Sequence, residues 1–285
     1  MKAAVRRLLM SLVPMFFLLG AASAQNPSTC TQNCPAPYVP NAFWTTQYGT
    51  ASANIVLSPT NFLACSSTSY ALCFYSGPNT APKKKRGSPA LPALPCRVSN
   101  DDQGIANCRC YAESGTSYVD IHAIRNTEAY IETVRVCGLD GAKCANLLST
   151  ELPDKVSSVT GGTPTALPTA PVCGYLQADA GGKAPMAPDA ELVSTFSFAR
   201  VKSYGLAQTS CTSTPAPYAG CMTASCTFER DAKGKSTGFA TCRCPIYTGP
   251  FQVGQADAAC DLGGGNVWSA GYAPGSGGSG SSSAQ

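Results

Sequence analysis

The sequence predicts a mainly β protein made of two related disulfide-rich β domains, each built around a cysteine-stapled hairpin. The first observation is a repeat. The stretch from Cys226 to Tyr247, CTFERDAKGKSTGFATCRCPIY, recurs in shorter form from Cys96 to Tyr111, CRVSNDDQGIANCRCY, and both copies reach Ala-x-Cys-Arg-Cys after a polar, turn-rich gap. The second is that all sixteen cysteines follow the apolar N-terminal segment. An even number of cysteines behind an export signal is typical of a disulfide framework.

The N-terminus predicts export from the cytoplasm. Three basic residues precede an apolar run from Leu8 to Gly20, and small residues follow this run. We therefore interpret residues 1–24 as a secretory signal peptide. The run is shorter than the roughly 20 residues that a membrane-spanning helix needs, and no later segment approaches that length. A secreted or periplasmic location is expected, with no transmembrane segment in the mature chain.

Changes in composition divide the exported part of the chain into segments. The two domains contain the cysteine repeats, and Pro, Gly, Ser and Thr dominate the connecting and terminal segments, as in linkers and disordered tails. In chain order we predict an irregular lead-in at 25–42, a first six-cysteine β domain at 43–152 with a Pro/Lys-rich loop at 76–95, a linker at 153–190, a second six-cysteine β domain at 191–272, and a disordered Gly/Ser tail at 273–285.

Strand predictions rest on runs of aromatic and β-branched residues that end at turn-forming residues. Outside the hairpins these runs are Phe43–Tyr48, Asn54–Leu57, Ala71–Tyr75, Tyr118–Ile124 and Leu192–Ala199. The segment Ala129–Cys137 fits a strand by its β-branched residues and nearly fits a helix by its apolar spacing; we predict a strand. A short helix is predicted over Ala142–Leu152.

Each half carries six cysteines in the same order. The first set is Cys65, Cys73, Cys96, Cys108, Cys110 and Cys137; the second is Cys211, Cys221, Cys226, Cys242, Cys244 and Cys260; and Cys30, Cys34, Cys144 and Cys173 are left over. Residues i and i+2 of a strand share a face and lie near the upper limit of bridging distance. The two cysteines of each Cys-Arg-Cys should therefore bond to different segments. Six cysteines allow fifteen connectivities, and the sequence does not choose among them.

Several classes of function are not supported by the sequence. No cysteine pair has Cys-x-x-Cys spacing and His122 is the only histidine, so no Cys/His metal site is predicted. No P-loop, dinucleotide motif or EF-hand loop is present, and no cofactor is predicted. The formal charge of +4 falls to +1 when the three basic residues of the signal peptide are removed. A nucleic-acid partner is not expected, because basic residues do not spread over a face.

Two sets of residues are candidates for binding. Arg109 and Arg243 occupy matched positions on the strand face opposite the cysteines, with Tyr111 and Tyr247 close behind, and arginine with aromatic residues is common in recognition surfaces. An arginine that covers the hairpin with its aliphatic stem would explain the same pattern.

The second set is the basic run Lys83, Lys84, Lys85 and Arg86 in the predicted loop. A solvated loop accounts for such a run. Contact with an anionic polymer or with phospholipid headgroups, and proteolytic processing, are the alternatives.

Catalysis has weaker support. Asp120 and His122 would share a face on a strand, and an aspartate that orients a histidine is half of a nucleophilic triad. There is no G-x-S-x-G elbow, and the second half has no histidine. The sequence therefore favours a binding protein, or an envelope or extracellular structural component, with an unknown ligand and no enzymatic role. The alternative is a secreted hydrolase that uses carboxylates or the Asp120/His122 pair.

Overall fold

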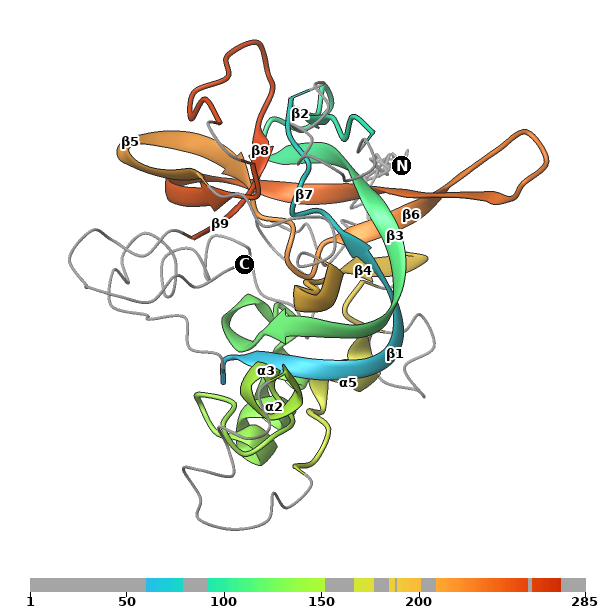
Figure 1. The fold of residues 1–285 in the computed structure, drawn as a ribbon, viewed down its shortest axis with the longest axis vertical. Helices are drawn as coiled ribbons and strands as arrows, with labels where there is room; N and C mark the ends of the chain where they lie inside the picture. Colours follow the sequence, from blue (N-terminus) through green and yellow to red (C-terminus); the bar gives the residue numbers. More distant parts are fainter. Residues whose placement is uncertain are drawn as a thin grey trace, which may run out of the picture.

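The computed structural model describes residues 60–78, 92–151, 167–176, 185–187, 189–200, 209–255 and 258–272. The predicted signal peptide, lead-in and tail, and the strands expected at Phe43–Tyr48 and Asn54–Leu57, lie outside these residues. Within them, the predicted mainly β, disulfide-rich fold is confirmed: strands form one extended sheet, and the helices are few and short (Figure 1).

The strands follow one another along the chain as two series. The first series is β1 (Phe62–Leu72), β2 (Cys96–Val98), β3 (Ile105–Asp120) and β4 (Leu192–Ser194), and the second is β5 (Thr209–Ala219), β6 (Ser225–Arg230), β7 (Ser236–Val253), β8 (Trp268–Ser269) and β9 (Gly271–Tyr272). Between β3 and β4 lie η2 (Ile121–Ala123), α2 (Thr127–Cys137), α3 (Leu147–Glu151) and α5 (Val172–Tyr175).

Both predicted hairpins form, and they join each other edge to edge. Strands β2 and β3 pair with Cys96 opposite Cys108, and β6 and β7 pair with Cys226 opposite Cys242. Strand β3 then pairs antiparallel with β7, with Cys108 opposite Cys242. The order β2-β3-β7-β6 is therefore a four-stranded unit, here called the platform, with a pseudo-twofold axis between its two central strands.

Near the end of each series, one strand crosses to the hairpin of the other series: β4 in the first and β8 in the second. Strand β4 pairs in parallel with β1, with Val193 opposite Tyr70, and antiparallel with β6. Strand β8 repeats this arrangement: Trp268 pairs in parallel with Tyr218 of β5, and the preceding Asn266 forms an antiparallel bridge with Arg97 of β2. The two halves are thus interlocked in one network of paired strands. Their division into two domains stays a prediction.

Seven disulfides join the cysteines of the described residues, and none of these cysteines is free. Two pairs repeat between the halves: Cys96–Cys108 matches Cys226–Cys242, and Cys73–Cys110 matches Cys221–Cys244. The prediction that each Cys-Arg-Cys bonds in two directions is therefore confirmed.

The outer cysteines of the two halves pair differently. The second half forms Cys211–Cys260, whereas the first forms Cys65–Cys173 and Cys137–Cys144. The reason is the helical insertion between β3 and β4, which supplies two additional cysteines as partners. Cys30 and Cys34 lie outside the described residues.

The strand predicted over Ala129–Cys137 is wrong, because this segment belongs to helix α2. The Asn126 side chain caps the helix by accepting the Ala129 N–H at 3.1 Å, a favourable start for a helix. The buried residues Ala129, Thr133 and Cys137 recur every four positions and form a helical face. The β-branched Ile131 is 60% exposed, so its strand propensity does not decide the structure.

Other boundaries differ by a few residues from the predictions. The expected helix at Ala142–Leu152 is the shorter α3, and the expected strands at Ala71–Tyr75, Tyr118–Ile124 and Leu192–Ala199 are cut short by the ends of β1, β3 and β4. In the described part of the chain, no helix is both long and apolar enough to cross a bilayer.

Disulfides fill the core beneath the platform. The cysteine face of its strands carries four bridges, and the side chains between them are small, including Ala71, Ala106, Ala219 and Ala240. Small neighbours are needed because a close-packed interior leaves no spare volume beside the sulfur atoms. On the opposite face, Ile105 and Tyr111 are buried at the two ends of the β3 segment that pairs with β7, and polar side chains lie between them.

Candidate binding surface

Polar side chains cross the platform in register on the face opposite the cysteines. In one row, Arg97 on β2, Asn107 on β3 and Arg243 on β7 are successive cross-strand partners. In the next row, Arg109 on β3 lies opposite Thr241 on β7. Because side chains alternate along a strand, all five point away from the disulfide core. We call this surface the arginine face.

Arg97 and Arg243 are the exposed cations of this face. Neither makes an ion pair or a side-chain hydrogen bond with any described residue. Both flank Asn107, and neighbouring strands lie about 4.8 Å apart, so their Cα atoms are about 10 Å apart. Two guanidinium groups that no described residue neutralises thus lie close together on a sheet whose strands are cross-linked by disulfides.

Arg109 is fixed by its surroundings instead. Its Nε donates to both carboxylate oxygens of Glu229 at 3.0 Å, and its Nη1 donates to the carbonyl of Ala93 at 3.2 Å. The guanidinium carbon lies 3.8 Å from the ring centroid of Phe239, within the range of a cation–π contact. Glu229 offsets its charge, so Arg109 supports the arginine face more than it offers a free cation.

Neither candidate tyrosine adds an exposed group to this face, although strand alternation puts Tyr111 on the same side of β3 as Arg109. Tyr111 is buried, with its ring 5.7 Å from that of Phe239, and burial and then the charge of Glu113 raise its pKa to about 12. Tyr247 is half-buried, and its hydroxyl accepts a hydrogen bond from Arg125 Nη2 at 3.3 Å. The aromatic ring that accompanies Arg109 is Phe239, which the sequence pattern did not single out.

The basic run Lys83 to Arg86 lies outside the described residues, but both ends of its loop are described. Gly77 bridges Pro95, and the backbone N–H of Arg109 donates to the Pro95 carbonyl at 2.8 Å. The loop therefore leaves and rejoins the sheet beside Arg109. This position places the loop's base at the edge of the arginine face.

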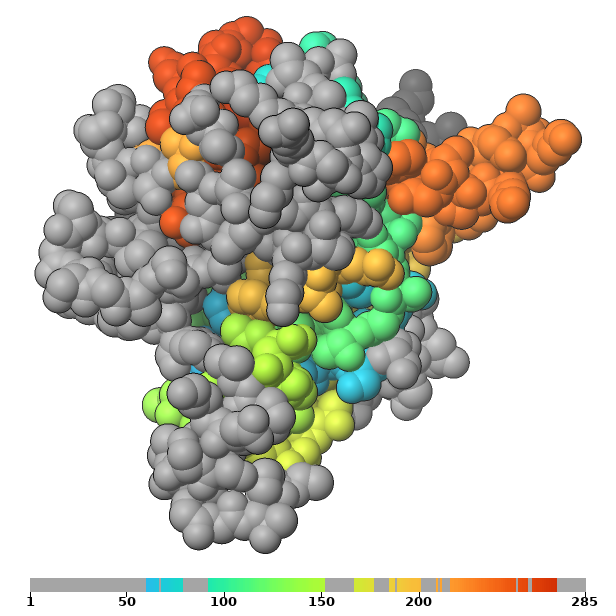
Figure 2. Space-filling model, viewed as in Figure 1, coloured from blue at the N-terminus to red at the C-terminus, as the bar shows by residue number. Residues whose placement is uncertain are grey.

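A long hairpin arm extends from the platform beyond the body of the molecule (Figures 1 and 2). Every residue from Arg230 to Gly238 is exposed. The Asp231 carboxylate holds the turn by accepting the backbone N–H groups of Lys233 and Lys235 at 2.9 Å. No ion pair with a described residue neutralises either lysine. The arm thus presents two cations beside the platform.

Sequence reasoning missed Arg97, although a signal was present. Arg97 directly follows Cys96, so strand alternation places it opposite the cysteine face. The matching residue of the second hairpin is Thr227. A search for residue types shared by both hairpins therefore passes over Arg97. The pairing of β3 with β7, which brings Arg97 and Arg243 to the same residue Asn107, had no sequence signal.

The Asp120 and His122 side chains do meet, with Oδ1 and Nδ1 3.1 Å apart. They do so at the start of η2 and not along one strand face. The same Asp120 oxygen accepts the backbone N–H of His122 at 2.9 Å and caps η2. A local structural role therefore accounts for this pair.

Carboxylates elsewhere are engaged by arginines. Besides Glu229, Glu113 pairs with Arg200 at 3.0 Å and Glu191 pairs with Arg230. Arg230 and then the Phe228 N–H lower the pKa of Glu191. These contacts give the acids a structural explanation and do not define a pair suited to hydrolysis.

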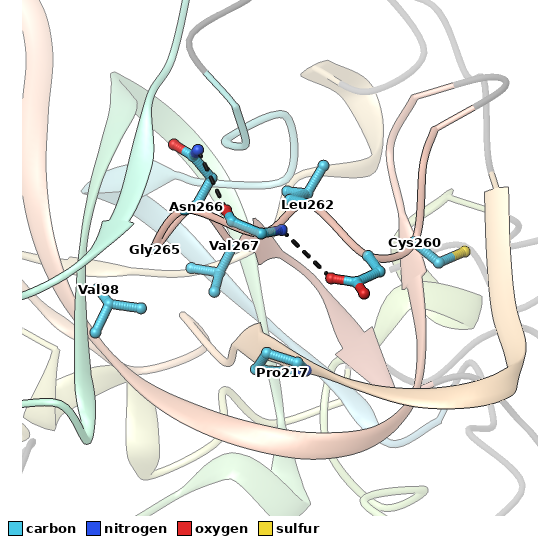
Figure 3. A pocket seen from close by; sticks show the side chains of 10 residues that line it. Val98, Pro217, Cys260, Leu262, Gly265, Asn266 and Val267 are labelled. Carbon is cyan, nitrogen blue, oxygen red and sulfur yellow. Dashed lines mark hydrogen bonds between the residues drawn. The ribbon is translucent and has the colours of Figure 1, made fainter.

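A small hollow lies between β2, β5 and the segment that precedes β8 (Figure 3). It encloses about 140 Å³ and is lined by Val98, Pro217, Cys260 and the loop Asp261–Val267. Pockets that bury a drug-sized ligand are roughly 300–1,000 Å³. The hollow is therefore too small for a substrate of that size.

Three cysteine pairs approach one another closely enough to be considered as metal ligands. Within the described residues, the Sγ atoms of Cys73, Cys110 and Cys242 lie within 4.8 Å of one another, as do those of Cys73, Cys221 and Cys244. All five are in disulfides and so lack the thiolate that binds a metal.

Comparison with protein-family models, with curated proteins and with solved structures finds no match. A β fold with seven disulfides is typical of proteins from an oxidising extracellular or periplasmic compartment. Any finer statement of function rests on the surface described above.

Proposed function

We propose that this protein is secreted or periplasmic and binds an anionic polymer of the cell envelope or its surroundings through the arginine face. One observation carries the proposal: Arg97 and Arg243 are exposed on either side of Asn107, and neither forms an ion pair with a residue that the structure describes. Such binding would also anchor the protein as a structural component of the envelope.

Arginine suits this task because of its geometry. Its planar guanidinium donates two parallel hydrogen bonds to a carboxylate, sulfate or phosphate group. The strands that carry the arginines are cross-linked by Cys96–Cys108 and Cys226–Cys242. Binding to a rigid surface loses less conformational entropy than binding to a mobile one.

The shape of the site favours a polymer over a small molecule. The arginine face is the outer surface of a sheet, and none of its five side chains lines the small hollow beside β8. A polymer can contact several separated cations at once, which gives avidity. The arm lysines, Lys233 and Lys235, and the predicted run Lys83, Lys84, Lys85 and Arg86 would add long-range attraction, which salt screens.

The test is binding of the full mature chain to immobilised dextran sulfate and to a polyuronate. The double variant Arg97→Ala/Arg243→Ala should bind at least about tenfold more weakly, because each charge-assisted contact contributes about 1.5–3 kcal/mol. Arg135→Ala, which removes an exposed arginine from α2, is the matched control and should bind normally. Equal losses in both variants, or none in the double variant, would reject the arginine face.

The hydrolase alternative has one favourable observation, the 3.1 Å contact between Asp120 and His122. If it holds, His122→Ala should abolish an activity found by screening ester and glycoside substrates, whereas Arg97→Ala/Arg243→Ala should leave catalysis at saturating substrate intact. Retention of full activity by His122→Ala would dismiss this version. Activity that depends on a carboxylate pair would instead respond to single Glu→Gln changes.

A further inference from the structure

We propose that three disulfides near the pseudo-twofold axis form one thiol–disulfide exchange site, at which a small monothiol attacks Cys221 and the exchange passes to Cys73. The three bridges are Cys73–Cys110, Cys221–Cys244 and Cys226–Cys242. This reactivity is independent of polymer binding by the arginine face.

Cys73 is the cysteine shared by both groups of close sulfur atoms, and we call it the hub of the cluster. Its Sγ lies within 4.8 Å of the sulfurs of Cys110 and Cys242, and also within 4.8 Å of those of Cys221 and Cys244. Cys73 can therefore reach a sulfur of each of the three bridges. Among the described residues, no sulfur of the bridges Cys65–Cys173, Cys137–Cys144 and Cys211–Cys260 belongs to such a group.

The register of the platform explains this crowding. Because Cys108 lies opposite Cys242, position Cys110 faces Ala240 and position Cys244 faces Ala106. The two matched bridges are thus brought to either side of one axis. Alanines between them leave the sulfurs without bulky separators.

Cys221 is the point of entry. Among the cysteines of the cluster it has the largest exposed fraction, 4%, against 3% for Cys73, and it lies in the loop between β5 and β6. Cys173 and Cys260 are more exposed, but their bridges lie outside the cluster. Thr223 in that loop has φ of 62°, a left-handed conformation that is unfavourable for a β-branched residue. Opening the adjacent bridge would let this loop relax, which favours attack there.

The proposed exchange leaves the numbers of disulfides and of thiols unchanged. A monothiolate such as glutathione attacks the Cys221 sulfur, forms a mixed disulfide and releases Cys244 as a thiolate. The Cys244 thiolate attacks the Cys73 sulfur, so a Cys73–Cys244 bond forms, the Cys73–Cys110 bond breaks and Cys110 leaves as a thiolate that takes up a proton. One thiol and two disulfides enter, and one thiol and two disulfides remain.

A hydroxyl is placed to help the leaving group. Ser76 Oγ lies 3.6 Å from Cys110 Sγ and donates to the Arg109 carbonyl at 2.6 Å. The hydroxyl can turn from this carbonyl to the new thiolate. A hydrogen bond to a thiolate lowers its pKa and makes it a better leaving group.

The test treats the native protein with limiting glutathione, stops exchange with acid, alkylates free thiols and maps the linked peptides by mass spectrometry. The expected products are glutathione on Cys221, a Cys73–Cys244 link and alkylated Cys110. Modification of both cysteines of one native bridge without a new link would overturn the proposal. So would no reaction, or random links that include Cys137 or Cys144.

Two double variants sharpen the result. Cys73→Ser/Cys110→Ser removes the hub, so alkylation should move from Cys110 to Cys244. Cys137→Ser/Cys144→Ser removes a bridge outside the cluster and should leave the Cys73–Cys244 product unchanged. If the hub variant does not fold, the map of the unaltered protein alone decides the question.

Discussion

Cys108 on β3 lies directly opposite Cys242 on β7, and each is also bonded across its own hairpin. Four cysteines therefore form one row across the platform, from Cys96 to Cys226. Backbone hydrogen bonds along this row join the two hairpins, and a disulfide cross-links each hairpin. The stability of the platform, the proposed binding surface and the proposed thiol–disulfide exchange all depend on this register.

Among the disulfides that the structure describes, the one that closes the longest loop should contribute most to stability. Cys65–Cys173 spans a sequence separation of 108 and Cys137–Cys144 one of 7. On the chain-entropy model the first bridge stabilises by about 5 kcal/mol and the second by about 2 kcal/mol. Serine double variants at each pair, compared by urea unfolding, should show this order. A larger loss at the short loop would contradict it, and full reduction of all bridges should unfold the protein.

Gly77→Ala should destabilise the protein by about 1–3 kcal/mol, the range for overpacking a filled site. A Cβ atom on Gly77 would overlap the ring of Trp268, which belongs to the strand that crosses from the other half. Thermal unfolding measures the loss. Gly174→Ala is the control, because a Cβ atom on Gly174 would meet no neighbouring atom within 4 Å and its φ is not left-handed; this variant should retain its stability.

Alkaline pH should destabilise the fold through buried tyrosines. Burial raises the pKa of Tyr70, Tyr111, Tyr118 and Tyr175, that of Tyr111 from 10.0 to about 12. Between about pH 10 and pH 12 the unfolded chain has lost these protons while the folded chain keeps them, so the free energy of unfolding falls as pH rises. Tyrosinate absorbance and circular dichroism should change together. Ionisation of every tyrosine near pH 10 with the fold intact would refute this.

Low pH should destabilise the part of β6 next to Glu191, because protonation removes the charge of the Glu191 carboxylate. Its carboxylate pairs with Arg230 and accepts the Phe228 N–H at 2.7 Å, and these contacts lower its pKa. The stabilisation is present above the ordinary carboxylate pKa and is lost as pH falls through the lowered one. Both side chains are substantially exposed, so the loss should stay below about 1 kcal/mol.

Hydrogen exchange at the Phe228 amide measures this local effect. Glu191→Gln should speed the exchange at neutral pH and remove its acid dependence. Asp101→Asn, in an exposed turn of the other hairpin, should leave it unchanged. Equal exchange rates in Glu191→Gln and the unaltered protein would show that the carboxylate does not protect this edge.

Part of the arginine face could be predicted and part could not. Alternation along a strand placed Arg109 and Arg243 opposite the cysteines, and the structure agrees. The burial of Tyr111 and the exposure of Arg97 depend on which segments pack on each end of the platform. Residue types along a strand do not predict this packing. The alternation of side chains shows which side of the sheet a residue lies on, but not whether other segments cover that side.

Local pattern by itself determined the mainly β class, both stapled hairpins and the opposite directions of the bonds in each Cys-Arg-Cys. These features depend on neighbours along the chain and on the two-residue period of a strand. Tertiary structure decided the rest: the helix at Thr127–Cys137, the pairing of β3 with β7, and the crossing of β4 and β8 between halves. Such pairings join segments far apart in sequence, so they are selected by the burial and hydrogen bonding of the whole fold.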